Sequence, residues 1–77
     1  GERTRPPPER GVTTFELIGL IDRLPGRRWG RRYGQLRESG LLGRPAALLV
    51  LSEFAGSLPA KHEDRARLER LVLAERG

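Results

Sequence analysis

The feature that most constrains the fold is a run of six apolar residues, 46–51, within the segment from Pro45 to Gly56. No other segment is as hydrophobic, so this one is expected to form the middle of the core. A run this short suits a buried strand or a helix, and its flanks decide between them. Pro45 suits the first helical position and Gly56 suits a C-terminal cap with positive φ. We therefore predict a helix from Pro45 to Ala55.

The predicted central helix is apolar on almost every side. With about 100° between successive residues, only the sector that holds Ser52 and Glu53 is polar, and Leu49 projects between these two. Such a helix needs several others to cover it. Leu49 is therefore expected either to be partly exposed or to be covered by another chain.

A second helix is predicted near the N-terminus. Thr13 and Glu16 have the spacing of a capping box, in which each side chain satisfies a backbone N–H group of the other residue. Apolar residues cover more than half of the circumference of this helix, which exceeds what one packing partner requires. Phe15 and Ile18 flank its main apolar stripe and are expected to face a third helix or a second molecule.

Residues 26–34 repeat the pattern Gly-Arg-Arg-aromatic. In a helix, this spacing places Trp29 and Tyr33 on one face and the arginines largely on the opposite face. Three glycines weaken such a helix by about 1 kcal/mol each, so a loop that leads into a shorter helix remains an alternative. We predict the helix, with Gly40 as the residue that ends it.

A last helix is predicted after Pro59, because acidic residues lie near its N-terminal end and Arg76 lies near its C-terminal end, as the helix dipole favours. Leu73 projects away from its core face, which a simple monomer does not explain. The expected fold is all-α, a small four-helix domain over 12–77 in an orthogonal or irregular bundle, after a flexible, disordered Pro-rich tail or linker over 1–11. The predicted helices are 14–24, 28–39, 45–55 and 61–76.

Length and composition exclude several classes of protein. Seventy-seven residues form at most one domain, with little room for a deep cleft. The absence of cysteine excludes a disulfide framework and a cysteine-based zinc site. No segment approaches the roughly 18 apolar residues of a membrane-spanning helix, and the N-terminus lacks the apolar core of a signal peptide. We expect a soluble, intracellular (cytoplasmic) protein that does not bind membranes.

No residue pattern predicts catalysis or metal binding. His62 is the only histidine, and on a helix its side chain points away from those of its neighbours Glu63 and Asp64. The serines have no base placed near them in the sequence, and the glycines match neither a phosphate loop nor a dinucleotide-binding fingerprint. We therefore expect no enzyme activity, no cofactor, no bound metal and no small-molecule substrate.

Positive charge is concentrated in the middle third of the chain. The segment from Arg23 to Arg44 has seven arginines and one acidic residue, whereas the rest has 8 basic and 9 acidic residues. Guanidinium groups suit phosphate geometry and displace counterions from nucleic acids. Trp29 and Tyr33 are candidates for stacking on unpaired bases, although their spacing favours packing in the core. The candidate binding arginines are Arg23, Arg27, Arg28, Arg31, Arg32, Arg37 and Arg44.

Two functions fit this pattern. The first is nucleic-acid binding, mostly independent of sequence, through phosphate contacts of the arginines. The second is a docking, adaptor or assembly-accessory role, in which the arginines meet an acidic protein surface and the surplus apolar residues contact a partner or a second copy of the chain. The candidate apolar interface residues are Phe15, Ile18, Leu49 and Leu73.

Overall fold

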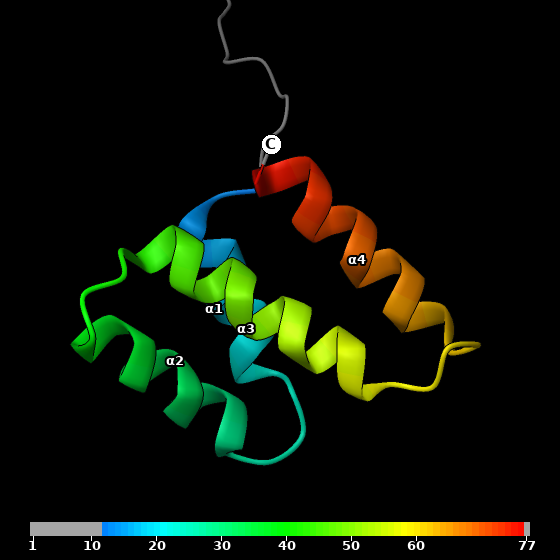
Figure 1. Ribbon diagram of the computed structural model, residues 1–77, viewed down its shortest axis with the longest axis horizontal. Helices are drawn as coiled ribbons and strands as arrows, with labels where there is room; N and C mark the ends of the chain where they lie inside the picture. The colour runs from blue at the N-terminus through cyan, green and yellow to red at the C-terminus, as the bar shows by residue number, and fades with distance from the viewer. Residues whose placement is uncertain (1–11, 77) are drawn as a thin grey trace, which may run out of the picture.

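The computed structural model describes residues 12–76, and this part of the chain folds into four helices without strands (Figure 1). The all-α, four-helix prediction is therefore confirmed. The predicted disordered tail over 1–11 lies outside the described residues. None of the helices in the described part is both long and apolar enough to cross a bilayer. The helices are α1 (Thr14–Asp22), α2 (Arg28–Glu38), α3 (Gly43–Ser57) and α4 (Glu63–Arg76).

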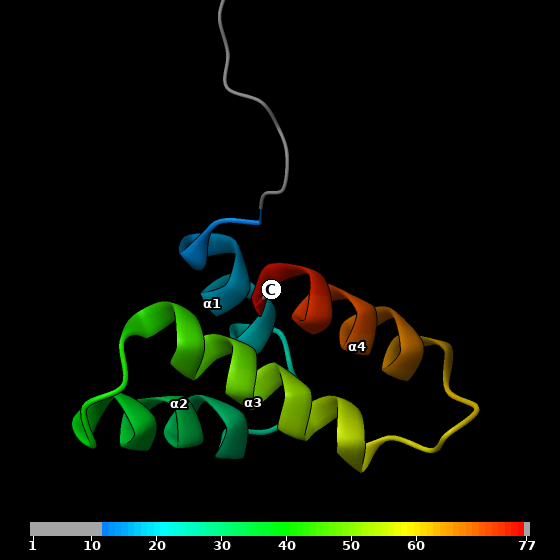
Figure 2. The ribbon, with the colours of Figure 1, turned by 45° about the horizontal axis from the view of Figure 1, so that its top comes forward.

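The central helix is α3. It lies between α2 and α4 in both views of the ribbon, with α1 crossing it on a third side (Figures 1 and 2). It contacts each of the other three helices, whereas α4 contacts α3 alone. Because α3 is surrounded in this way, most of its circumference can be apolar. Its buried side chains are those of Ala46, Ala47, Leu48, Val50, Leu51 and Ala55.

The ends of α3 differ from the prediction. Pro45 lies at the third helical position instead of the first, where it is tolerated because the N–H groups of a first turn have no partner within the helix. Gly56 lies inside the last turn without a positive φ, so it is not the cap. The capping residue is Leu58, which has an extended backbone with ψ 153°. Pro59 accounts for this stop, because a proline disfavours helical geometry in the residue before it.

The start of α1 is the capping box that its sequence predicts. The Thr13 N–H donates to Oε1 of Glu16 at 2.8 Å, and the Glu16 N–H donates to Oγ1 of Thr13 at 3.1 Å. The helix ends at Asp22, two residues before the predicted Leu24. Pro25 again explains the earlier stop, since it restricts the backbone of Leu24.

For residues 28–38, the helix is correct and the loop alternative is wrong. The helix α2 ends in a Schellman motif around Gly40, whose φ is 110°. The Leu41 N–H donates to the Leu36 carbonyl and the Gly40 N–H donates to the Arg37 carbonyl, both at 3.1 Å. Gly40 therefore ends the helix as predicted.

The helix α4 begins two residues later than predicted, at Glu63. His62 precedes it, and its ring Nδ1 accepts a hydrogen bond of 3.1 Å from the Asp64 backbone N–H. This bond satisfies one of the N–H groups that have no partner in a first helical turn. The only histidine of the chain thus has a role in local structure.

Candidate functional site

The seven candidate arginines fall into two groups according to what their guanidinium groups contact. Those of the first group bind carboxylate or carbonyl oxygens within the fold. Those of the second group are exposed and form no ion pair with another described residue. The first group is Arg32, Arg37 and Arg44, and the second, which we call the arginine surface, is Arg23, Arg27, Arg28 and Arg31.

Arg32 connects α2 to α3 through a bidentate ion pair. Its Nε and Nη2 each donate to an oxygen of the Glu53 carboxylate at 3.1 Å. The hydrogen bond that Arg32 donates to this carboxylate, together with the negative charge of Glu53, raises the pKa of Arg32. The positive charge of this guanidinium is largely offset by Glu53. Sequence alone grouped Arg32 with the other arginines because Glu53 is distant along the chain.

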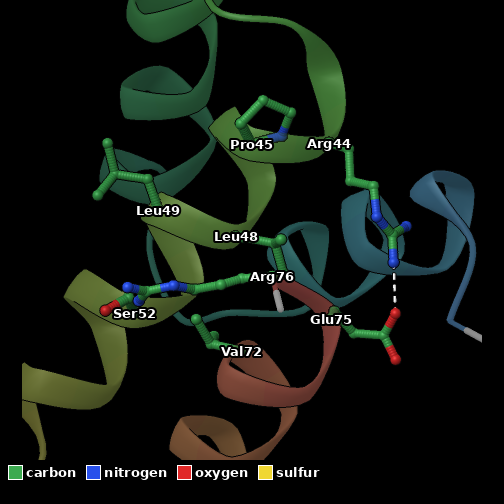
Figure 3. Close-up of a pocket in the computed structure, with 8 residues that line it drawn as sticks. All are labelled: Arg44, Pro45, Leu48, Leu49, Ser52, Val72, Glu75 and Arg76. Carbon is green, nitrogen blue, oxygen red and sulfur yellow. Dashed lines mark hydrogen bonds and ion pairs between the residues drawn. The ribbon is translucent and has the colours of Figure 1, made fainter. Parts of the chain in front are cut away.

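Arg44 holds together three parts of the fold. Its Nη1 donates to the Val12 carbonyl at 2.7 Å, and its Nη2 pairs with the carboxylate of Glu75 near the end of α4 (Figure 3). The Glu75 side chain is only 9% exposed, so this carboxylate needs its partner. Arg44 therefore acts as a structural residue at the start of α3.

Arg37 supports the turn between α2 and α3. Its Nη1 donates to the Leu41 carbonyl at 2.9 Å, although the residue is exposed. This bond satisfies a carbonyl just beyond the helix end, as basic residues near helix C-termini often do. Arg37 is thus less available to a partner than the arginines at the other end of α2.

Three residues of the arginine surface, Arg27, Arg28 and Arg31, lie at the N-terminal end of α2, where basic residues lower helix stability. Arg27 is the N-cap of α2 and makes no side-chain capping bond, and the first turn, which contains Arg28 and Arg31, has no acidic residue. The helix dipole is positive at this end and disfavours cations there. Arginines three or four positions apart on a helix also repel each other. Helix stability therefore does not explain the positions of Arg27 and Arg31, whereas Arg28 also lies over the Trp29 ring.

Two shallow hollows flank the exposed face of α2, and Arg31 borders both. The hollow on the α1 side has a volume of about 440 Å³, and the one on the α3 side has a volume of about 320 Å³. Arg27, Gly30 and the acidic Asp22 line the first hollow, whereas Arg28 and the Arg32–Glu53 pair line the second. Arg31 therefore stands on a ridge, with another surface arginine in the hollow on each side.

The two candidate stacking aromatics pack in the fold. Trp29 is 8% exposed, and its ring meets that of Phe54 edge to face, with centroids 5.5 Å apart. The Arg28 guanidinium carbon lies 4.8 Å from the Trp29 ring centroid. Tyr33 is half-buried against the core, with its hydroxyl beside Gly43. These contacts favour core packing for both aromatic residues. Stacking on bases stays a prediction, and the burial of the Trp29 ring argues against it because a buried ring is not accessible to a base.

The candidate apolar interface residues do not form one patch. Phe15 is 86% exposed, Leu73 is 64% exposed and Leu49 is 38% exposed, whereas Ile18 is half-buried. Phe15 lines a hollow on α1, and Leu49 lines a different one, of about 510 Å³, between α3 and α4 (Figure 3). Leu42 is 72% exposed but is not among the predicted interface residues, because it precedes α3 and helical periodicity assigns it to no face.

The hollow between α3 and α4 has an apolar floor and charged ends. Leu48 and Val72 form the buried part of its lining, and the Arg44–Glu75 pair lies at one end (Figure 3). The Arg76 side chain extends across it toward Ser52. Within residues 12–76, no cluster of three or more histidine, aspartate or glutamate side chains is placed to hold a metal ion.

Comparison with known proteins supplies no function for this chain. The function must therefore be inferred from the residues and their geometry. No protein-family model, no curated protein and no solved structure matches this chain.

Proposed function

We propose that the protein is a non-catalytic module that binds nucleic acid by phosphate contacts through the arginine surface. The observation that carries this proposal is the group of exposed arginines at the N-terminal end of α2, where they have no acidic partner among the described residues and weaken the helix. A polyanion relieves this repulsion, because it supplies the negative charge that the first turn of α2 lacks.

The proposed binding is largely independent of base sequence. Arginines are the side chains best suited to bidentate phosphate contact, and phosphate contacts position a protein without reading bases. The ridge at Arg31, with Arg27 and Arg28 in the hollows beside it, offers contacts to neighbouring phosphates of one backbone. Such binding is expected to be micromolar or tighter at low salt and to weaken steeply as salt is added.

Fluorescence anisotropy with a generic labelled DNA duplex, and with single-stranded DNA and RNA, tests the proposal. The test variant carries Arg27→Ala, Arg28→Ala and Arg31→Ala. The control carries Arg67→Ala, Arg70→Ala and Arg76→Ala, which removes the same formal charge from exposed positions on α4. We expect the first variant to bind at least about tenfold more weakly than the control at low salt. Undetectable binding of the unmodified protein at low salt would contradict the proposal.

A second candidate function is docking onto an acidic protein surface. The exposed Phe15 favours it, since nucleic-acid phosphates offer nothing for this ring to pack against. A complex of this kind should persist at salt concentrations that abolish nucleic-acid binding, because part of its free energy comes from apolar burial. Sedimentation at high salt of an acidic candidate partner, mixed either with the unmodified protein or with its Phe15→Ser variant, separates the two functions. Docking predicts a complex that the variant weakens.

A further inference from the structure

The outer face of α1 carries an apolar hollow that the four-helix core leaves uncovered. It has a volume of about 500 Å³, and its apolar lining is Val12, Phe15 and Leu20, with Gly19 among them. The helix α1 contacts α3 and α2 but not α4, so no described helix covers this face. Phe15 is 86% exposed at this hollow, which leaves a large apolar area in water.

The charges at the two ends of this hollow are opposite. Glu16 and Arg23 both line it, and residues seven apart lie on the same face of a helix about two turns from each other. Arg23 forms no ion pair with another residue in 12–76. Glu16 uses Oε1 in the capping box, whereas its Oε2 accepts no hydrogen bond within that part of the chain. The hollow is therefore complementary in charge to a copy of itself turned end to end.

Gly19 is also consistent with a second helix packing on this face of α1. A Cβ atom placed on Gly19 would have no heavy atom of residues 12–76 within 4 Å outside its own helix, so packing within the described part of the chain does not require a glycine. A glycine inside a helix also lowers helix stability. A glycine does, however, allow a second helix to approach the backbone closely.

We propose that this face of α1 binds the same face of a second copy of the chain, as an antiparallel helix pair around a twofold axis. With the axis between Gly19 and Leu20, each Glu16 faces Arg23 of the other copy and each Gly19 faces Leu20 of the other copy. Each Phe15 then covers Leu20 and the aliphatic stem of the other Arg23. A parallel pair would instead bring equal charges together, which disfavours it.

The homodimer rests on other observations than the proposed nucleic-acid binding, but it would remove Arg23 from the arginine surface. Because the interface uses Arg23, the dimer would present Arg27, Arg28 and Arg31 twice, once on each copy. One short helix per copy buries less area than a standard stable interface, so a dissociation constant in the micromolar range is expected. Failure of dimerisation would leave the nucleic-acid proposal intact, and the reverse also holds.

Sedimentation equilibrium of the full chain, from micromolar to millimolar concentration, tests the homodimer. We expect a monomer–dimer equilibrium that Phe15→Ser weakens at least about tenfold. Gly19→Leu should weaken it similarly while raising the Tm of the monomer, since leucine favours the helix and the space around Gly19 is open. Leu73→Ser, a change at an exposed apolar residue of α4, is the control and should leave the equilibrium unchanged.

A charge exchange tests the antiparallel geometry. Arg23→Glu and Glu16→Arg should each prevent self-association, because each variant brings equal charges together. A mixture of the two should restore a heterodimer with two ion pairs. Circular dichroism establishes that Glu16→Arg is folded, since it removes half of the capping box. A chain that is monomeric throughout the concentration range, or a Gly19→Leu variant that dimerises like the unmodified chain, would overturn the proposal.

Discussion

The helices α2 and α4 are both rich in arginine, but they place it in opposite ways. In α4 the acidic residues Glu63 and Asp64 occupy the first turn and Arg76 the last, as the helix dipole favours. Two of its four arginines also pair with acidic residues of the same helix, with Arg65 Nε 3.2 Å from Glu69 Oε2 and Arg67 Nη1 3.4 Å from Asp64 Oδ1.

In α2 the first turn is basic and contains no acidic residue. Only Arg32 has a carboxylate partner among the described residues, and this carboxylate belongs to α3. The charges of α4 are therefore accounted for by helix stability and solvation. Helix stability does not account for the charges of Arg27, Arg28 and Arg31. This difference is the reason for assigning a binding role to α2 and none to α4.

The largest expected effect separates the arginines that hold the fold from those that do not. Glu75→Ala leaves Arg44 half-buried without its carboxylate and should lower the free energy of unfolding by about 2 kcal/mol. Glu69→Ala breaks an exposed pair within α4 and should change it by less than about 0.5 kcal/mol. Urea denaturation measures both. Equal losses would mean that Arg44 is no more structural than the arginines of α4.

A smaller effect is expected when a structural arginine loses its carboxylate partner and becomes available to a ligand. Glu53→Gln removes the carboxylate that pairs with Arg32 and so adds a cation to the exposed face of α2. Nucleic-acid affinity at low salt should rise about two- to fivefold, with a small decrease in Tm. An unchanged affinity would indicate that the binding face does not extend to the α3 side of α2.

The smallest effect concerns the N-cap of α2. Arg27→Asp places a negative charge at the positive end of the helix and relieves repulsion with Arg31, four positions away. The free energy of unfolding should increase by about 0.5 kcal/mol while nucleic-acid binding weakens. Thermal denaturation and fluorescence anisotropy of the same variant test whether stability rises while nucleic-acid affinity falls. A variant that loses stability would contradict the view that Arg27 is unfavourable for folding.

The existence and order of the helices follow from local sequence signals. The Thr13–Glu16 capping box fixed the start of α1, and Gly40 fixed the end of α2, because each acts through backbone groups a few residues away. The ends of α1 and α3 were misplaced by two residues. In both, the decisive signal is the proline beyond the end, Pro25 or Pro59, because a proline restricts the residue before it. The prediction instead continued α1 up to the residue before Pro25 and took Gly56 as the cap of α3.

The division of the arginines could not be predicted in the same way. Glu53 lies 21 residues from Arg32, and Glu75 lies 31 residues from Arg44, so these pairs depend on how α3 packs against α2 and α4. Helical periodicity gives the face of a residue on its own helix but not the side chain opposite it. The sequence identified the arginine-rich segment, and the fold separates its structural arginines from its exposed ones.

The salt dependence of nucleic-acid binding tests the central claim most directly. Each arginine that neutralises a phosphate of duplex DNA contributes about 0.9 to the slope of log K against log salt concentration. Replacing Arg27, Arg28 and Arg31 by alanine should therefore reduce the magnitude of the slope by about 2.7, whereas replacing Arg67, Arg70 and Arg76 should leave it nearly unchanged. Equal reductions in the two variants would show that net charge, and not the arginine surface of α2, determines binding.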